Sequence, residues 1–310
     1  MRVLSEIDLD ELRATQARHE PVWLDLRDPG DEELTAVADV LGLHELAIED
    51  SREFGQRPKL DRYDDRLLLV FFGLHLQENG VPCQVEVHIH IAPGCVLTVS
   101  RVPPAQLERV RESLQQTSEC SQGELVYRVI DAVADSLTEG LDTVAGQIDT
   151  FERTIFYRPR ARDRDRMAVL RRTLNGLRRT VVTQRQIFDR TTDQIASIAD
   201  ETEDIRAYLD DVGDHLWRAL DEIDADRETL QGMLETYSNE VQERLTIVAT
   251  IFLPLSALTG FFGMNFNWMI DHVGSAWTFF GLGVGGLLLS SLLIVLWLRR
   301  TGLLDQSDEV

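Results

Sequence analysis

Cysteine is scarce in this sequence, and its spacing ties no part of the chain together. Three cysteines occur among 310 residues, at Cys83, Cys95 and Cys120, and none belongs to a CxxC pair. An odd number of widely spaced thiols indicates neither a disulfide framework nor a zinc ribbon. A phosphate-binding loop, a nucleophile elbow and an HExxH motif are also missing, so an enzyme is the least supported class of function.

Charge is absent from two long segments near the C-terminus. Residues 245–266 and 276–298, which are 22 and 23 residues long, contain no Asp, Glu, Lys or Arg. Each exceeds the ~20 apolar residues that cross the hydrocarbon core of a bilayer. We therefore predict two transmembrane helices joined by a short loop at residues 267–275.

Basic residues are missing from that loop, and this sets the expected orientation. Arg244 precedes the first span, and Arg299 and Arg300 follow the second. The positive-inside rule places both termini in the cytoplasm and the loop outside. The N-terminus has no apolar core of signal-peptide length, so we expect residues 1–244 to remain cytoplasmic and the chain to be a multi-pass protein of the cytoplasmic membrane.

The first 244 residues are strongly acidic. The whole chain has 53 acidic and 31 basic residues, and the last 66 residues hold 4 acids and 2 Arg, which leaves 49 acids against 29 bases. This balance argues against a nucleic-acid partner and is compatible with cations.

Residues 1–120 mix strand and helix patterns. Short runs rich in Val, Leu, Ile and Phe, bounded by Pro, Gly and Asn, predict strands at 22–26, 66–76, 85–91 and 95–99. Residues 31–43 begin with acids, have helical spacing and carry Gly42 near the end, which predicts a helix. We expect a cytoplasmic α/β domain with a mixed sheet.

Residues 121–244 read as long, coiled-coil-like helices. Apolar residues recur every seven positions from residue 124, Pro159 ends the first helix, and further helices follow at 164–193 and 200–244. No Pro or Gly pair separates the last helix from the first span, which predicts one helix roughly 90 Å long. The fold class is thus α+β with a membrane part: an α/β domain (1–120), a helical domain with a stalk (121–244) and a two-helix pore domain (245–310).

The second and third helices carry opposite charge. Residues 153–190 hold 12 Arg against 3 acids, and residues 200–228 hold 12 acids against 3 Arg. Salt bridges between neighbouring helices are one interpretation. The other is that the acidic helix faces a cavity or a subunit interface, where it binds divalent cations.

One side of the first span and the residues just before it is polar or small. Two spans cannot enclose a water-filled path, so transport requires several copies around an axis. A path without charge suits an ion that keeps its water, and Mg²⁺ loses water reluctantly. The alternative is that small and polar residues only pack helices together. The residues of this stripe are Asn239, Gln242, Leu245, Thr246, Ala249, Leu253, Ser256 and Gly260.

Two segments resemble the CorA family of magnesium channels. They are RLTIVATIFLPLSALTGFFGMNF, which contains Gly263, Met264 and Asn265, and LGLHELAIEDSREFGQRPKLDRYDDRLLLV. The resemblance implies a homopentamer in membrane lipid that passes hydrated Mg²⁺, and also Co²⁺ or Ni²⁺. It implies that Gly263, Met264 and Asn265 form the selectivity filter at the outer mouth, with Asn239 at the inner end of the pore.

The same resemblance implies regulation by intracellular Mg²⁺. In this family Mg²⁺ also binds between subunits of the cytoplasmic part and lowers conduction. The matching positions are Glu49 and Asp50, with Asp211 and the nearby Asp214 as partners on the stalk helix.

Two other functions stay open. A proton-coupled Zn²⁺ transporter of the ZntB type shares the architecture, but such proteins tend to replace the Met of the Gly-Met-Asn motif, which this chain keeps as Met264. His88 and His90 share one strand face and offer zinc ligands, although sheet packing accounts for them better than a two-ligand site. A membrane-anchored scaffold without transport would explain the heptads but not the polar stripe.

Overall fold

The computed structural model describes residues 2–4, 7–18, 20–77, 80–116, 120–157, 161–199, 203–264 and 275–300. The chain divides into two compact units, Met1–Leu234 and Glu235–Val310. Pro159, Asn265 and the loop 267–274 lie outside the described residues.

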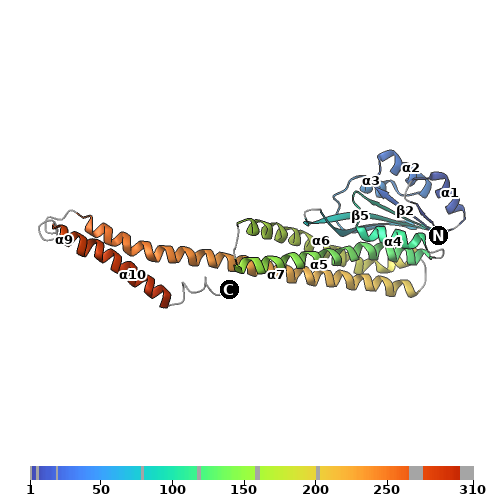
Figure 1. Cartoon of the computed structure of the whole chain (residues 1–310). Coiled ribbons are helices and arrows are strands. Elements are labelled where there is room, and N and C mark those ends of the chain that lie inside the picture. The colour runs from blue at the N-terminus through green and yellow to red at the C-terminus, as the bar shows by residue number, and fades with distance from the viewer. Residues whose placement is uncertain are drawn as a thin grey trace. The chain divides into compact units, whose positions relative to one another are not determined.

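A six-stranded mixed sheet forms the centre of the first unit (Figure 1). The strand order is β1-β2-β6-β5-β4-β3, with β1–β2 and β2–β6 parallel and the other pairs antiparallel. The strands are β1 (Arg2–Leu4), β2 (Val22–Arg27), β3 (Lys59–Tyr63), β4 (Arg66–Leu76), β5 (Pro82–Ala92) and β6 (Cys95–Ser100).

Three short helices cover one face of the sheet. They are α1 (Leu9–Ala17), α2 (Asp31–Leu41) and α3 (Glu45–Arg52), and they bury residues such as Leu34 and Ile48 against β2 and β6. Ala47 of α3 packs on Leu68, Val70 and Phe72, the side chains that β4 directs to this face. Helix α2 ends at Gly42, whose φ of 62° is a left-handed conformation that favours glycine.

Long helices cover the opposite face. The helices α4 (Ala105–Gln115), α5 (Gln122–Tyr157), α6 (Ala161–Ala199) and the first part of α7 (Glu203–Phe262) share one core with Leu67, Leu69 and Phe71 of β4. Helix α7 contributes a buried series at heptad-like spacing, which packs on α5 and α6 because all three helices turn apolar stripes inward. The series is Ile205, Leu209, Val212, Leu216, Ala219, Ile223, Leu230 and Met233.

Charge pairing joins α6 to α7, as the first interpretation of the opposite charges predicts. The guanidinium of Arg178 binds Asp224 through both oxygens, at 2.6 and 3.0 Å, and Arg227 lies 2.8 Å from the same carboxylate. Arg206 and Asp193 form a further pair at 3.2 Å. The basic helix therefore neutralises part of the acidic helix within one subunit.

The second unit holds the end of α7 and the second apolar segment. Helix α7 is one element of 60 residues, so the prediction of a continuous stalk and first span is confirmed. The second segment consists of α9 (Ala276–Thr278), a π-helix η1 (Phe279–Val284) and α10 (Gly285–Arg300). Two helical segments, within Ile205–Phe261 and Ala276–Ile294, are long and apolar enough to cross a membrane.

The predicted strands and long helices are confirmed. The features that were not predicted are the short helices α1, α3 and α4, the strands β1 and β3, and the π-helix η1. The edge strands β1 and β3 are short or charged, and KLDRY in β3 lacks the apolar alternation that signals a strand. The π-helix interrupts what reads as a uniform α-helix, at a place where Gly281 and Gly283 make the backbone permissive.

Gly73 provides a test of how closely β4 approaches α5. A Cβ atom at this position would lie 2.3 Å from Ser136 Oγ and 3.1 Å from the Val133 carbonyl oxygen. Ser136 also accepts a hydrogen bond from the Leu74 N–H at 2.9 Å, which the added carbon would displace. Gly73→Ala should destabilise the fold by about 1–3 kcal/mol, measured as a lower midpoint of thermal unfolding of the full-length protein in detergent.

Gly146→Ala is the matched control. Gly146 lies in α5 with nothing within 4 Å of an added Cβ. Alanine there should be neutral or stabilise the helix by up to about 1 kcal/mol. Equal effects of the two substitutions would contradict the close approach at Gly73.

Candidate functional site

The predicted conduction stripe lies along the end of α7, and its side chains are exposed in the single chain. All eight predicted positions from Asn239 to Gly260 are exposed, including Leu245 at 64% and Leu253 at 71%. The side chains on the other side of the helix, such as Ile251 and Leu255, are half-buried. Val248 and Phe252 are exposed as well, so the open face is wider than the predicted stripe.

The hydroxyl group of Thr246 is oriented by its own helix. It donates a hydrogen bond to the Gln242 carbonyl at 2.8 Å. Its hydrogen is therefore occupied, and the oxygen offers lone pairs outward. Water bound to a cation turns its hydrogens away from the ion, so an acceptor of this kind suits a hydrated cation.

Helix α7 ends where the Gly-Met-Asn motif begins. Its last helical residue is Phe262, and the N–H of Gly263 donates to the Thr259 carbonyl at 2.9 Å. Met264 N–H reaches the Phe261 carbonyl at 3.3 Å. Asn265 follows directly but lies outside the described residues, so its role as a filter stays a prediction.

Asp50 of α3 has a counter-ion in its own chain. Lys59, the only lysine in the sequence, places Nζ 2.6 Å from Asp50 Oδ2 and 2.9 Å from Asp61 Oδ2. Burial lowers the pKa of Lys59, but the hydrogen bonds that its ammonium donates to both carboxylates outweigh burial and raise the pKa above the usual value. Glu49, beside Asp50, is exposed. A cation that binds Asp50 must therefore compete with an ammonium group.

The four residues predicted to regulate conduction do not meet within one chain. Glu49 and Asp50 lie on α3, whereas Asp211 and Asp214 lie on α7, across the sheet (Figure 1). A cation shared by both pairs therefore has to join two subunits. The two stalk residues also have different surroundings. Asp211 Oδ2 lies 3.7 Å from His215 Nε2, whereas Asp214 lines a pocket of about 590 Å³ between α6 and α7.

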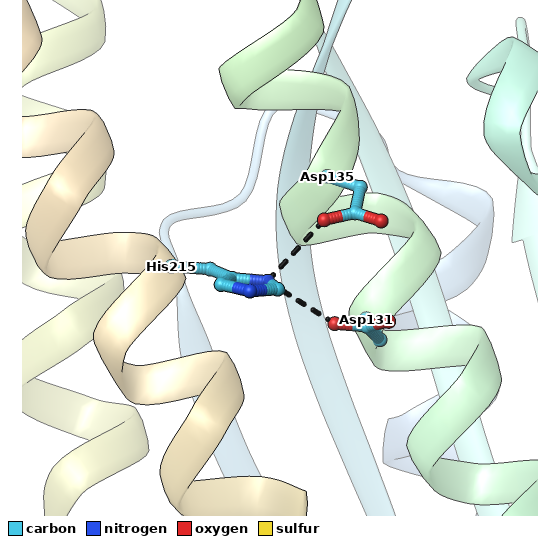
Figure 2. Close-up of side chains that lie close together, drawn as sticks. All are labelled: Asp131, Asp135 and His215. Carbon is cyan, nitrogen blue, oxygen red and sulfur yellow. Dashed lines mark ion pairs between the residues drawn. The ribbon is translucent and has the colours of Figure 1, made fainter.

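A cluster of ligand-type side chains surrounds His215, next to Asp211. Figure 2 shows Asp131 and Asp135 of α5 directed toward the imidazole of His215, and each carboxylate has an oxygen 3.2 Å from Nδ1. The three ligand atoms lie within 4.8 Å of one another. Two carboxylates and an imidazole can hold a divalent cation.

Electrostatics make this cluster receptive to positive charge. Burial and then the charge of Asp135 raise the pKa of the Asp131 carboxyl, although His215 opposes the shift. Burial and Asp131 also raise the pKa of Tyr127 to about 12. Asp131 Oδ1 and His215 Nδ1 lie 3.2 Å apart but are not aligned for a hydrogen bond, and within the described part of the chain both are buried without one. A bound cation would relieve both the repulsion and the missing contacts.

His88 and His90 of β5 are buried where α3 packs on the sheet. Ser51 Oγ lies 2.8 Å from His90 Nε2 and 3.0 Å from His88 Nδ1, and His88 Nε2 lies 2.7 Å from Glu86 Oε1. Glu86 accepts from the N–H groups of Gly55 and Gln56. Because the Glu86 carboxylate only accepts hydrogen bonds, His88 carries its proton on Nε2 and donates it to Glu86. The Nδ1 atom of His88 then accepts from the Ser51 hydroxyl, and the Ser51 oxygen accepts from His90 Nε2.

The pKa values agree with this network. Burial and the neighbouring His88 lower the pKa of His90 to about 3, so it is neutral. Burial raises the pKa of Glu86, but hydrogen bonds from His88 and Gly55 outweigh it and lower the value. These nitrogens serve the packing of α3 on β5, which favours the sheet-packing interpretation over a zinc site.

The sequence profile of the CorA-like Mg2+ transporter protein family matches residues 19–300. The chain belongs to this family. The cobalt/magnesium transport protein CorA of Thermotoga maritima is 26% identical over 86% of this chain and 80% of its own length. The zinc transport protein ZntB of Yersinia pseudotuberculosis is 22% identical over 93% of this chain and 89% of its own.

A solved structure shares the CorA-like fold. The complete structure of the CorA magnesium transporter from Methanocaldococcus jannaschii matches with a TM-score of 0.65 and 20% identity, and covers 91% of each chain. At this identity the match supports the architecture alone. It agrees with the mixed sheet, the long helices and the two C-terminal spans of this CorA-like chain.

Ser51 provides a test of the buried network in this CorA-like chain. Ser51→Ala removes a partner from both buried histidines at once, and unpaired buried polar groups are costly. The substitution should destabilise the protein by about 1–3 kcal/mol, seen as a lower midpoint of thermal unfolding. Ser197→Ala, whose exposed hydroxyl bonds only to its own helix at Gln194, should stay within about 0.5 kcal/mol. If Ser51→Ala unfolds at the same temperature as the unchanged protein, this network does not stabilise the packing of α3 on the sheet.

Proposed function

We propose that this protein is a divalent cation channel that passes hydrated Mg²⁺, and also Co²⁺ or Ni²⁺, across the cytoplasmic membrane. The observation that carries the proposal is the exposed, uncharged stripe on α7. A helix in lipid has no reason to turn Thr246, Ser256 and Gly260 outward unless they meet water or other copies of the helix.

An oligomer completes the path. One chain supplies one stripe, so several copies must surround an axis, and resemblance to the family favours five. Residues 245–310 form the pore domain, and residues 1–120 and 121–244 stay on the cytoplasmic side with both termini. Rings of Leu245 and Leu253 can close such a path by expelling water.

The Gly-Met-Asn segment is the proposed filter. A ring of Asn265 carboxamides at the outer mouth holds a hydrated ion through dipoles rather than full charges, and therefore also releases it. The helix ends just before Gly263, which supports a position at the end of the pore.

Intracellular Mg²⁺ is the proposed gating ligand. Glu49 and Asp50 of one subunit face Asp211 of the next, and Asp214 lies one turn further along the stalk. The cluster of Asp131, Asp135 and His215 adjoins Asp211 and extends the site with oxygen ligands, which Mg²⁺ prefers. Binding there locks neighbouring subunits together and closes the pore.

Proton-coupled Zn²⁺ transport is the second candidate. The imidazole of His215 beside two carboxylates is a ligand set that Zn²⁺ also accepts, and ZntB is among the relatives. Retention of Met264 and the absence of charge along the stripe favour Mg²⁺.

Ion flux separates the two candidates. Proteoliposomes that contain the full-length protein and a Mg²⁺ indicator should show Mg²⁺ entry without a proton gradient, because a channel needs only the gradient of the ion. Asn265→Ala should abolish most of this entry, whereas Ser275→Ala, at the last residue of the loop, should retain it. Movement of Zn²⁺ alone, and only with a proton gradient, would replace the Mg²⁺ channel by the second candidate.

Gating is tested by opposite substitutions at one site. Asp50→Ala combined with Asp211→Ala should keep flux high at millimolar internal Mg²⁺, because the shared site loses a ligand on each side. Lys59→Met should have the reverse effect and shift inhibition to lower Mg²⁺ concentration, because it removes the ammonium that competes for Asp50. The measurement is flux as a function of internal Mg²⁺.

Arg62→Met serves as the control for Lys59→Met, because Arg62 is exposed on the same strand and donates to the Asp64 carbonyl rather than to Asp50. Unchanged inhibition in the double variant would exclude Asp50 and Asp211 from the regulatory site. A shift of Lys59→Met toward higher Mg²⁺ would contradict competition.

A further inference from the structure

A second group of carboxylates lies between α5 and α7, further along both helices than the His215 cluster. We call it the α5–α7 carboxylate seam, and it consists of Asp142 and Asp149 of α5 and Glu222 and Asp226 of α7. The spacings of seven and four residues place each pair on one helix face. Within the described part of the chain, none of the four forms an ion pair.

Asp226 is the unusual member of the seam. Its side chain belongs to a residue that is only 8% exposed, and in the described structure its Oδ2 is buried without a hydrogen-bond partner. Burial and the nearby charge of Asp149 raise its pKa to about 6. Burial, Asp142 and Asp226 likewise raise the pKa of Glu222 to about 6. The seam therefore contains mutually repelling acids around a buried, unpartnered carboxylate.

On the neighbouring face of α7, a carboxylate is paired with arginine side chains. Asp224, two residues earlier, faces α6, where hydrogen bonds from Arg178 and Arg227 lower its pKa. Arg227 also binds Asn175 at 2.6 Å, so this guanidinium is committed to the α6 side. Asp226 faces α5, and the charged groups that act on it and on Glu222 are all acidic.

We propose that the seam binds a hydrated divalent cation within each subunit, with Asp226 as the inner ligand and Asp149, Glu222 and Asp142 around it. The groups that act on Asp226 and Glu222 include no basic side chain, so a cation supplies the charge that the seam lacks. A proton does not neutralise the seam either, because groups that titrate near pH 6 are mainly ionised at neutral pH.

The spacing of the ligands favours an ion that keeps water. Across the described residues, the His215 cluster is the group with three ligand atoms within 4.8 Å of one another, and the seam is more open. Mg²⁺ retains several waters and binds proteins through one or two carboxylates, so it fits an open acidic seam. The bound ion holds α5 against α7 and stiffens the stalk from inside the subunit. This role is separate from the proposed site between subunits and from conduction.

The test counts ions on the full-length protein in detergent, with Mn²⁺ as a spectroscopic probe. The Asp50→Asn, Asp211→Asn background first removes the proposed site between subunits. In this background, Asp226→Asn and Asp149→Asn should each lose one Mn²⁺ per subunit that Mg²⁺ displaces, and should lose part of the rise in unfolding temperature caused by MgCl₂. Glu228→Gln, an exposed neighbour on α7, should match the background.

Several outcomes would overturn the proposal. Equal Mn²⁺ counts in the background and in folded Asp149→Asn or Asp226→Asn protein would exclude the seam. Because Asp149 is exposed, its substitution should not prevent folding, so it carries the test if Asp226→Asn is unstable. Stabilisation by acid between pH 7 and 5 without any response to Mn²⁺ or Mg²⁺ would identify a proton as the occupant. Flux assays report separately on the channel, so a failed channel and a failed seam give different results.

Discussion

The structure depends on one continuous helix that has to satisfy two different environments. Helix α7 buries an apolar series against α5 and α6 in the first unit, and its last turns present an uncharged stripe in the second unit. Both demands fall on the same backbone. The chain has Pro254 as its only proline in this helix, beyond the start of the apolar span.

The packed part of α7 sorts its acids by face. Toward α6, Arg178 pairs with Asp224 of α7, and Arg206 of α7 pairs with Asp193 of α6, so these pairs add to the apolar contacts. Toward α5 the acids meet other acids and one imidazole, His215. Repulsion on that side opposes the apolar packing, and it weakens whenever a cation is present. The proposed cation site would therefore act on the α5–α7 contact, whereas at the α6–α7 contact an arginine already pairs with Asp224.

Much of this fold could be predicted from the sequence, because its signals are local. Runs such as 66–76 alternate toward two buried faces, and the heptads of α7 need only one helix to be recognised. The edge strand β3 could not be found in this way, because Lys59 and Asp61 serve a charge contact with Asp50 rather than a core. That contact joins a helix and a strand through a loop, which no periodicity encodes.

The candidate sites also differ in whether their residues lie on one helix or on two helices that meet only in the fold. The stripe of α7 was predicted because it occupies one helix, but the His215 cluster and the seam join helices about 80 residues apart in the chain. The spacing of Asp131 and Asp135, and of Asp211 and His215, was a usable signal, since each pair faces one way. Which helix faces these pairs is decided by tertiary packing. Helix α6 follows α5 in the chain and leads back to the start of α7, which allows α7 to pack beside α5.

The change of composition along α7 has a chemical consequence for a cation. Residues 200–228 hold 12 acids, whereas residues 245–266 hold none. Carboxylates bind a divalent ion strongly and release it slowly, which suits a sensor that reports concentration. Carboxamides, hydroxyls and carbonyls hold only its water and let it leave, which suits conduction. In the proposed channel both kinds of ligand stand on one helix, so an ion held by the acids would act on the path through the backbone itself.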